Sequence, residues 1–319
     1  MATINLALLG GETALGQALL EVIADSPLRL PMLYPLTLAE EAGMVTFRGE
    51  DYPELEAADF DWQAAPVLVN CVPQAGEVLQ AAASAGTLVI DLAGERPAGG
   101  KLARGQILAL PTPFAQQLAT VIAPLAELGP LRGVSATGML SVSTEGPAGV
   151  DELSQQTRAL FAQTEQASEV YPKRIAYNLL GGMGEPDADG ITAEEAAALA
   201  LLKKLLPADC LLDVTCVRTP HFFGHGASIA LHFAAPVARE AVLGALKAAE
   251  RVFLLQVPGV AGVAASQDAV GGDKVWVSRV RFSEDGRGVT LWSVADNTRL
   301  PALAVLQLLT LVAARTAGT

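Results

Sequence analysis

The sequence predicts an α/β protein whose first half folds as a Rossmann-like, doubly wound parallel sheet and whose second half forms an α+β domain. Three observations support this fold class. Short apolar segments alternate with segments of helical periodicity in the first half, a glycine-containing turn follows the first apolar segment, and the second half is rich in strands. We place the first domain at residues 1–130, joined by a returning helix at 298–319, and the second domain at residues 131–297.

Strand-like and helix-like segments alternate along the first half. Each strand-like segment is short and apolar throughout, which is typical of a parallel sheet that helices cover on both faces. The helix-like segments repeat their apolar residues every three or four positions, as Leu15, Leu19 and Ile23 do. We expect strands at residues 4–9, 67–72, 87–92 and 106–110, and helices at 13–24, 75–85 and 115–128.

The second half holds more strands than helices. Its first long strand, residues 131–142, is expected to enter a new sheet. Thr192 begins one helix, and Glu195 three positions later completes a capping box, in which both side chains satisfy free backbone N–H groups. We expect the other strands at residues 210–218, 227–234, 274–282 and 288–294, and helices at 149–163, 192–206, 237–251 and 300–314.

Composition and charge exclude several classes of function. A formal net charge of −13 opposes binding to nucleic acid or to anionic membrane surfaces, because both require clustered Lys and Arg. The longest apolar stretch, residues 300–314, is interrupted by Gln307 and Thr310 and is shorter than the ~20 residues of a membrane span. The cysteines are few and odd in number, and no signal peptide is visible, so we expect a cytoplasmic protein.

A turn from Gly10 to Gly16 follows the first strand and opens the first helix. In a dinucleotide-binding turn, glycines let the backbone approach the pyrophosphate at the N-terminus of a helix. Here Thr13 holds the middle glycine position, where its side chain crowds that approach, and Glu12 adds a negative charge. Two interpretations stay open: a weakened dinucleotide site, or a strand–helix turn that kept only its shape.

Six segments, in the same order, resemble the aspartate-semialdehyde dehydrogenase family over nearly the whole chain. They are the opening strand and helix at 4–23, VIDLAGER at 89–96, SVSTEGPAGVDELSQQT at 141–157, RIAYN at 174–178, CVRTPHFFGH at 216–225 and the pair Asp296-Asn297. The resemblance implies an NADP-dependent oxidoreductase of amino-acid biosynthesis, which forms a thiohemiacetal at a cysteine and cleaves the thioester with phosphate. Within the family the chain is most similar to the Usg group of homologues, which also lack the usual active-site residues.

The departures from the family fall on the residues that carry its chemistry. Leu110-Pro111-Thr112-Pro113 stands where the family has Asn-Pro-Asn-Cys, so the nucleophile is absent at Pro113. Proline has neither a nucleophilic group nor an N–H. The family's active-site Gln, Glu and Lys align with Leu140, Leu201 and Ala197, its Lys-Gly after Asp-Asn aligns with Leu300-Pro301, and the Arg that pairs with the cofactor's 2′-phosphate aligns with Glu40.

The retained residues lead to a first hypothesis, that the chain is a catalytically degenerate homologue. It would bind a small anion, a metabolite or a partner protein. Arg218 would hold a carboxylate, which a guanidinium matches with two parallel hydrogen bonds, and Arg96 would be a second anion contact. His225 would remain as the remnant of an acid/base residue.

The second hypothesis is an active NAD(P)-dependent semialdehyde oxidoreductase. Its cofactor contacts would be Gly10, Thr13, Gly16 and Asn297. Glu40 would favour NAD over NADP, because a carboxylate accepts from a free ribose hydroxyl and repels a phosphate. Both cofactors are expected to bind weakly.

Cysteines and histidines add no further site. Cys71, Cys210 and Cys216 are interpreted as small hydrophobic residues of the core. His221, His225 and His232 are close in sequence, but no carboxylate neighbours them, so we predict no metal site. The resemblance also implies that the second domain pairs with its copy, and we therefore expect a homodimer through the C-terminal domain, with the first domain facing outward.

Overall fold

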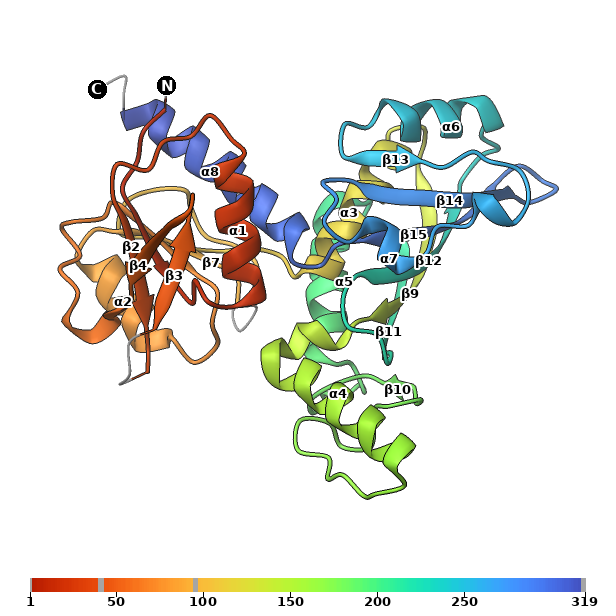
Figure 1. The fold of residues 1–319 in the computed structure, drawn as a ribbon. Coiled ribbons are helices and arrows are strands. Elements are labelled where there is room, and N and C mark those ends of the chain that lie inside the picture. The colour runs from red at the N-terminus through yellow and green to blue at the C-terminus, as the bar shows by residue number, and fades with distance from the viewer. Residues whose placement is uncertain (1, 40–42, 94–96, 317–319) are drawn as a thin grey trace. The chain divides into compact units, whose positions relative to one another are not determined.

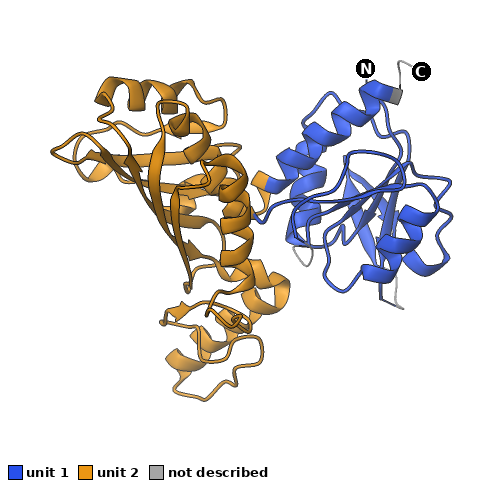
Figure 2. Cartoon of the chain, turned by 180° about the vertical axis from the view of Figure 1, so that it is seen from behind, with its two compact units in different colours: residues 1–112, 301–319 blue, residues 113–300 orange. Residues whose placement is uncertain are grey.

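The computed structural model describes residues 2–39, 43–93 and 97–316. The chain forms two compact units, with residues 1–112 and 301–319 in unit 1 and residues 113–300 in unit 2 (Figure 2). Unit 1 holds a parallel sheet, and unit 2 holds a mixed sheet with helices. The predicted fold class is therefore confirmed.

Unit 1 is built on a six-stranded parallel sheet in the order β5-β2-β1-β6-β7-β8. Leu6 and Leu8 face helices α1 (Ala14–Ala24) and α8 (Arg299–Thr316), whereas Ala7 and Leu9 face α2 (Gly76–Ser84) on the other side. Burial on both faces explains why these strands are apolar throughout. The strands are β1 (Leu6–Leu9), β2 (Leu33–Thr37), β5 (Leu55–Glu56), β6 (Val67–Asn70), β7 (Leu88–Asp91) and β8 (Ile107–Ala109); β3 (Met44–Phe47) and β4 (Glu50–Pro53) form a separate hairpin, followed by the short η1 (Ala57–Asp59).

Unit 2 is built on a seven-stranded mixed sheet in the order β10-β11-β9-β12-β15-β14-β13. Helices α3 (Pro113–Ala126), α5 (Ala193–Leu205) and α6 (Arg239–Ala248) cover one face, and helix α4 (Gly146–Ala162) packs on a smaller core of its own beside the sheet (Figure 1). The strands are β9 (Leu131–Leu140), β10 (Leu180–Gly181), β11 (Leu211–Arg218), β12 (His225–Phe233), β13 (Val252–Leu254), β14 (Val275–Phe282) and β15 (Gly288–Ala295). Short helical turns are η2 (Val142–Glu145), η3 (Val260–Gly262) and α7 (Ser266–Ala269).

The boundary between the units differs from the predicted boundary at 130/131. Helix α3 belongs to unit 2, which begins at residue 113. The ring of Phe114 lies so close to β9 that a Cβ on Gly138 would meet it at 2.6 Å, and Nε2 of Gln117 donates to Oγ of Ser293 at 2.9 Å. The sequence periodicity of α3 indicated an apolar face but could not indicate which sheet that face covers.

Two groups of elements were not predicted, because their sequences lack the expected patterns. β2 contains Pro35, which cannot donate to a sheet, and β5, β10 and β13 are only two or three residues long. The hairpin of β3 and β4 turns at Arg48 and Gly49, both with positive φ. The capping box at Thr192 and Glu195, in contrast, is present as predicted.

Candidate functional site

The turn between β1 and α1 needs its glycines for the packing of the chain itself. Gly10 has a φ of +83°, and a Cβ on it would lie 2.4 Å from Cγ1 of Val72. A Cβ on Gly16 would lie 2.2 Å from the carbonyl oxygen of Gly10. Neither glycine therefore requires a bound ligand as its explanation.

Thr13 closes the N-terminus of α1. Its hydroxyl accepts the N–H of Gly16 at 3.0 Å and donates to the carbonyl of Gly10 at 2.7 Å. An N–H that could bind a phosphate is thus already satisfied. Two acidic residues, Glu12 and Glu54, lie together beside this turn. Burial and the nearby Glu12 raise the pKa of Glu54 to about 7. These residues do not fit the pyrophosphate of a dinucleotide.

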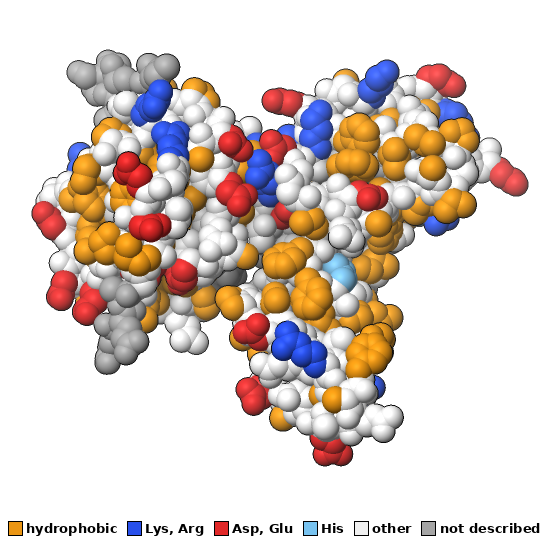
Figure 3. Space-filling model, in the orientation of Figure 1, with side chains coloured by type: hydrophobic (Ala, Val, Ile, Leu, Met, Phe, Trp, Pro, Cys, Tyr) orange, Lys and Arg blue, Asp and Glu red, His pale blue; other side chains and the backbone are white. Residues whose placement is uncertain are grey.

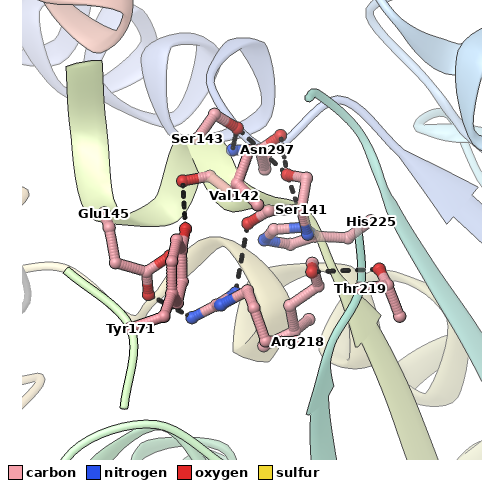
Figure 4. A network of polar contacts seen from close by, with 10 residues as sticks. Ser141, Val142, Ser143, Glu145, Tyr171, Arg218, Thr219, His225 and Asn297 are labelled. Atoms are coloured by element: carbon pink, nitrogen blue, oxygen red, sulfur yellow. Dashed lines mark hydrogen bonds and ion pairs between the residues drawn. The ribbon is translucent and has the colours of Figure 1, made fainter. Parts of the chain in front are cut away.

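Arg218, at the end of β11, is buried in unit 2, with 4 % of its surface exposed. Its Nη2 donates to Oε1 of Glu145 at 2.5 Å, and its Nη1 donates to the carbonyl of Ser141 at 3.2 Å (Figure 4). The hydroxyl of Tyr171 donates to the other carboxylate oxygen of Glu145 at 3.0 Å. The guanidinium that we predicted to hold a ligand carboxylate is thus paired with a carboxylate of the chain.

Glu145 is held at the end of η2, directly before α4. Burial raises the pKa of Glu145, while Arg218 and Tyr171 act in the opposite direction. Burial and the neighbouring Glu145 raise the pKa of Tyr171, so the phenol keeps its proton and remains a donor.

His225 begins β12 and is buried beside this ion pair (Figure 4). The N–H of Ser141 donates to its Nδ1 at 3.3 Å, so the neutral ring carries its proton on Nε2. Oδ1 of Asn297 accepts the N–H of Gly224 at 2.9 Å and the hydroxyl of Ser141 at 3.2 Å, and its Nδ2 donates to Ser143 at 2.9 Å. Asn297, which we predicted as a cofactor contact, lies in this internal network.

The site is electrically close to neutral apart from the ion pair. Burial lowers the pKa of His225 well below its usual value, and the positive charge of Arg218 acts in the same direction. Burial also lowers the pKa of His221, whose Nε2 donates to the carbonyl of Gly224 at 2.5 Å. Both rings are therefore uncharged at neutral pH.

The positions at which we expect the family's catalytic groups to be missing serve packing in this structure. Pro113 is the first residue of α3, where the fixed φ and the absent N–H of proline are favourable. Leu140 is buried in the core of unit 2, and Leu201 packs against that core. Arg96 and Glu40, which we predicted as contacts for an anion and for a ribose, lie outside the described residues.

The surroundings of the three cysteines oppose a role as nucleophile. Cys71 and Cys216 are buried, and burial raises the pKa of all three thiols, including Cys210, which opposes thiolate formation. Among the described residues, no group of three His, Cys, Asp or Glu side chains is placed to hold a metal ion. Within the same ranges, no helix is long and apolar enough to cross a membrane.

Two residues that complete the Arg218 site, Glu145 and Tyr171, were not predicted from the sequence. Tyr171 lies in a segment that α4 holds in place. The carboxylate of Glu152 accepts the N–H of Val170 at 2.5 Å, and Oε1 of Gln156 accepts the N–H of Ile175 at 2.9 Å. Glu152 and Gln156 lie four positions apart on one helix, and this spacing was a signal that both could hold a neighbouring segment. No sequence pattern indicated the pairing of Glu145.

Comparison with known proteins identifies the family to which this chain belongs. A family model described as semialdehyde dehydrogenase, dimerisation domain, matches residues 122–300. This chain belongs to the semialdehyde dehydrogenase family. It is 34% identical to a USG-1 protein homolog of Pseudomonas aeruginosa, over 93% of both chains. It is 28% identical to an aspartate-semialdehyde dehydrogenase of Shewanella violacea, over 92% of this chain and 93% of the relative.

Solved structures agree with this assignment. The chain matches aspartate semialdehyde dehydrogenase II of Vibrio cholerae, complexed with ASA, with a TM-score of 0.87 and 26% identity over 97% of this chain and 98% of that chain. It matches a probable aspartate-semialdehyde dehydrogenase of Pseudomonas aeruginosa with a TM-score of 0.83 and 32% identity, over 96% and 98% of the two chains. The fold of these proteins is thus retained along nearly the whole length of this chain.

The buried, neutral His225 predicts a pH-dependent stability. Below about pH 6.5 the unfolded chain binds a proton on this residue that the folded chain does not, so the free energy of unfolding falls as the pH decreases from there. In H225N the free energy of unfolding should fall less steeply with decreasing pH, by up to about 1.4 kcal/mol per pH unit. Urea titrations between pH 7.5 and 5 measure this slope. An unchanged slope in H225N would contradict the assignment.

Proposed function

We propose that this chain is a catalytically degenerate member of the semialdehyde dehydrogenase family that binds a small metabolite or a partner protein. The observation that carries this proposal is the internal pairing of Arg218 with Glu145. The resemblance to the family, in addition, aligns the nucleophile with Pro113. An acylating oxidation needs a thiolate, a substrate anchor and an acid/base group. Pro113 offers no thiolate, and the anchor is already occupied.

A second candidate, an active NAD(P)-dependent semialdehyde oxidoreductase, is favoured by one observation. Arg218 and His225 are both retained, and both contact Ser141. The turn at Thr13 argues against this candidate, because it satisfies the N–H of Gly16 internally.

We also propose that this chain forms a dimer through unit 2. The face of the unit 2 sheet that α3, α5 and α6 leave uncovered carries half-buried residues such as Thr137, Ser228 and Trp292, which are neighbours across β9, β12 and β15. A hollow of about 320 Å³ lies among Ser228, Arg279 and Trp292. The matching family model is named for dimerisation, and pairing of two such faces would cover them.

The first prediction of this proposal concerns activity. We expect no phosphate-dependent oxidation of aspartate semialdehyde above background, because Pro113 cannot form a thiohemiacetal. Nucleotide reduction is followed spectrophotometrically in the wild type and in a variant with Cys71, Cys210 and Cys216 all changed to Ser. Turnover that disappears with C71S alone would reveal a different nucleophile, and turnover that survives the triple change would reveal a different mechanism.

The second prediction concerns the cofactor. We expect NAD and NADP to bind no more tightly than about 1 mM by calorimetry, because the turn at Thr13 provides neither a free N–H of Gly16 nor a neutral surface. A T13G variant frees that N–H and is the matched comparison. A micromolar dissociation constant for the wild type, which corresponds to about −8 kcal/mol, would sink this part of the proposal and favour the second candidate.

The third prediction concerns assembly. Light scattering at tens of micromolar should report a dimer, and S228R, which puts a charge in the centre of the uncovered face, should report a monomer. K247E, on the exposed side of α6, is the control and should remain dimeric. A wild-type monomer, or a dimer that survives deletion of unit 2, would contradict the proposal.

A further inference from the structure

The ion pair of Arg218 and Glu145 is geometrically incomplete. Glu145 gives the guanidinium only one carboxylate oxygen, and its other oxygen accepts the hydroxyl of Tyr171. Nε of Arg218 is buried and has no hydrogen-bond partner among the described residues. A carboxylate that is free to rotate could accept from Nε and Nη2 together, in the two-bond arrangement that guanidinium favours.

Glu145 is also the more accessible member of the pair. Its side chain is 17% exposed, whereas that of Arg218 is 3% exposed. Removal of the Glu145 carboxylate would therefore leave a carboxylate-sized space that borders both solvent and Arg218. The space would be lined by the donors that now serve Glu145, the Tyr171 hydroxyl and Nη2 of Arg218.

Charge explains why the chain must fill this position. A buried guanidinium without a counter-ion is strongly destabilising, and the rings of His225 and His221 supply no negative charge. Glu145 supplies the negative charge, and its carboxylate is tethered next to Arg218. A tethered group competes with free ligands at a high effective concentration.

We propose that Glu145 is a built-in carboxylate ligand of Arg218, and that this position is a latent binding site for small carboxylates. In the native chain a ligand carboxylate reaches Arg218 only by displacing Glu145. This inference deepens the proposed function, since it names the ligand class of the same site. Its test does not involve turnover, so that its failure and the failure of the proposed function can be told apart.

The experiment replaces the tethered carboxylate with a free one. Glu145→Ala removes the side chain beyond Cβ, and acetate supplies the same atoms. We expect the melting temperature of E145A to lie below that of the wild type in chloride and to rise saturably when acetate replaces chloride at constant ionic strength. The acetate affinity of E145A should be at least about tenfold tighter than that of the wild type, since a buried ion pair is restored.

Matched variants separate this effect from general salt stabilisation. Acetamide, which has the same shape without charge, should not stabilise E145A. The double variant E145A/R218Q should not respond to acetate. E145Q keeps the size of the side chain, and its uncharged amide is a weaker partner for Arg218, so that it should show a smaller response than E145A but a larger one than the wild type.

Either of two results would overturn the inference. One is a folded E145A whose melting temperature is the same in acetate and in chloride. The other is an equal acetate response in E145A and E145A/R218Q. If E145A does not fold in either salt, an absent acetate response in E145Q decides against the inference in the same way.

Discussion

The need to neutralise one buried guanidinium organises the site of this chain. β11 runs parallel to β9, with Arg218 opposite Leu140, and this register places Arg218 inside unit 2. A buried positive charge requires a counter-ion, and Glu145 provides it. Tyr171 fixes the carboxylate of Glu145, and α4 in turn holds the segment of Tyr171 through Glu152. The ion pair thereby connects the sheet with the smaller core around α4.

The residues at the positions that we align with the family's catalytic groups fit the local packing of this chain. Pro113 suits the first turn of α3, and Leu140 and Leu201 add apolar contacts in unit 2. Thr13 caps α1 in a turn whose glycines are already required by the chain. This pattern is what a fold selected for stability without acylating oxidation would show, and it supports the proposed loss of catalysis.

Much of the fold could be predicted from the sequence, because apolar periodicity reports directly on burial. Four strands of the parallel sheet, β1, β6, β7 and β8, followed from their short apolar segments, and the start of α5 followed from Thr192 and Glu195. The placement of α3 could not be predicted, since its periodicity does not say which sheet it covers. The pairing of Glu145 with Arg218 was equally inaccessible, because it joins residues 73 positions apart through a tertiary contact.

The central claim is that Arg218 and Glu145 stabilise the fold as a pair. The most direct measurement is a double-mutant cycle of E145Q, R218Q and the double variant, with the free energy of unfolding determined by urea titration. We expect a coupling free energy of about 1–3 kcal/mol between the two residues, as found for contacts within one buried network. A coupling near zero, with each single change acting independently of the other, would contradict the account.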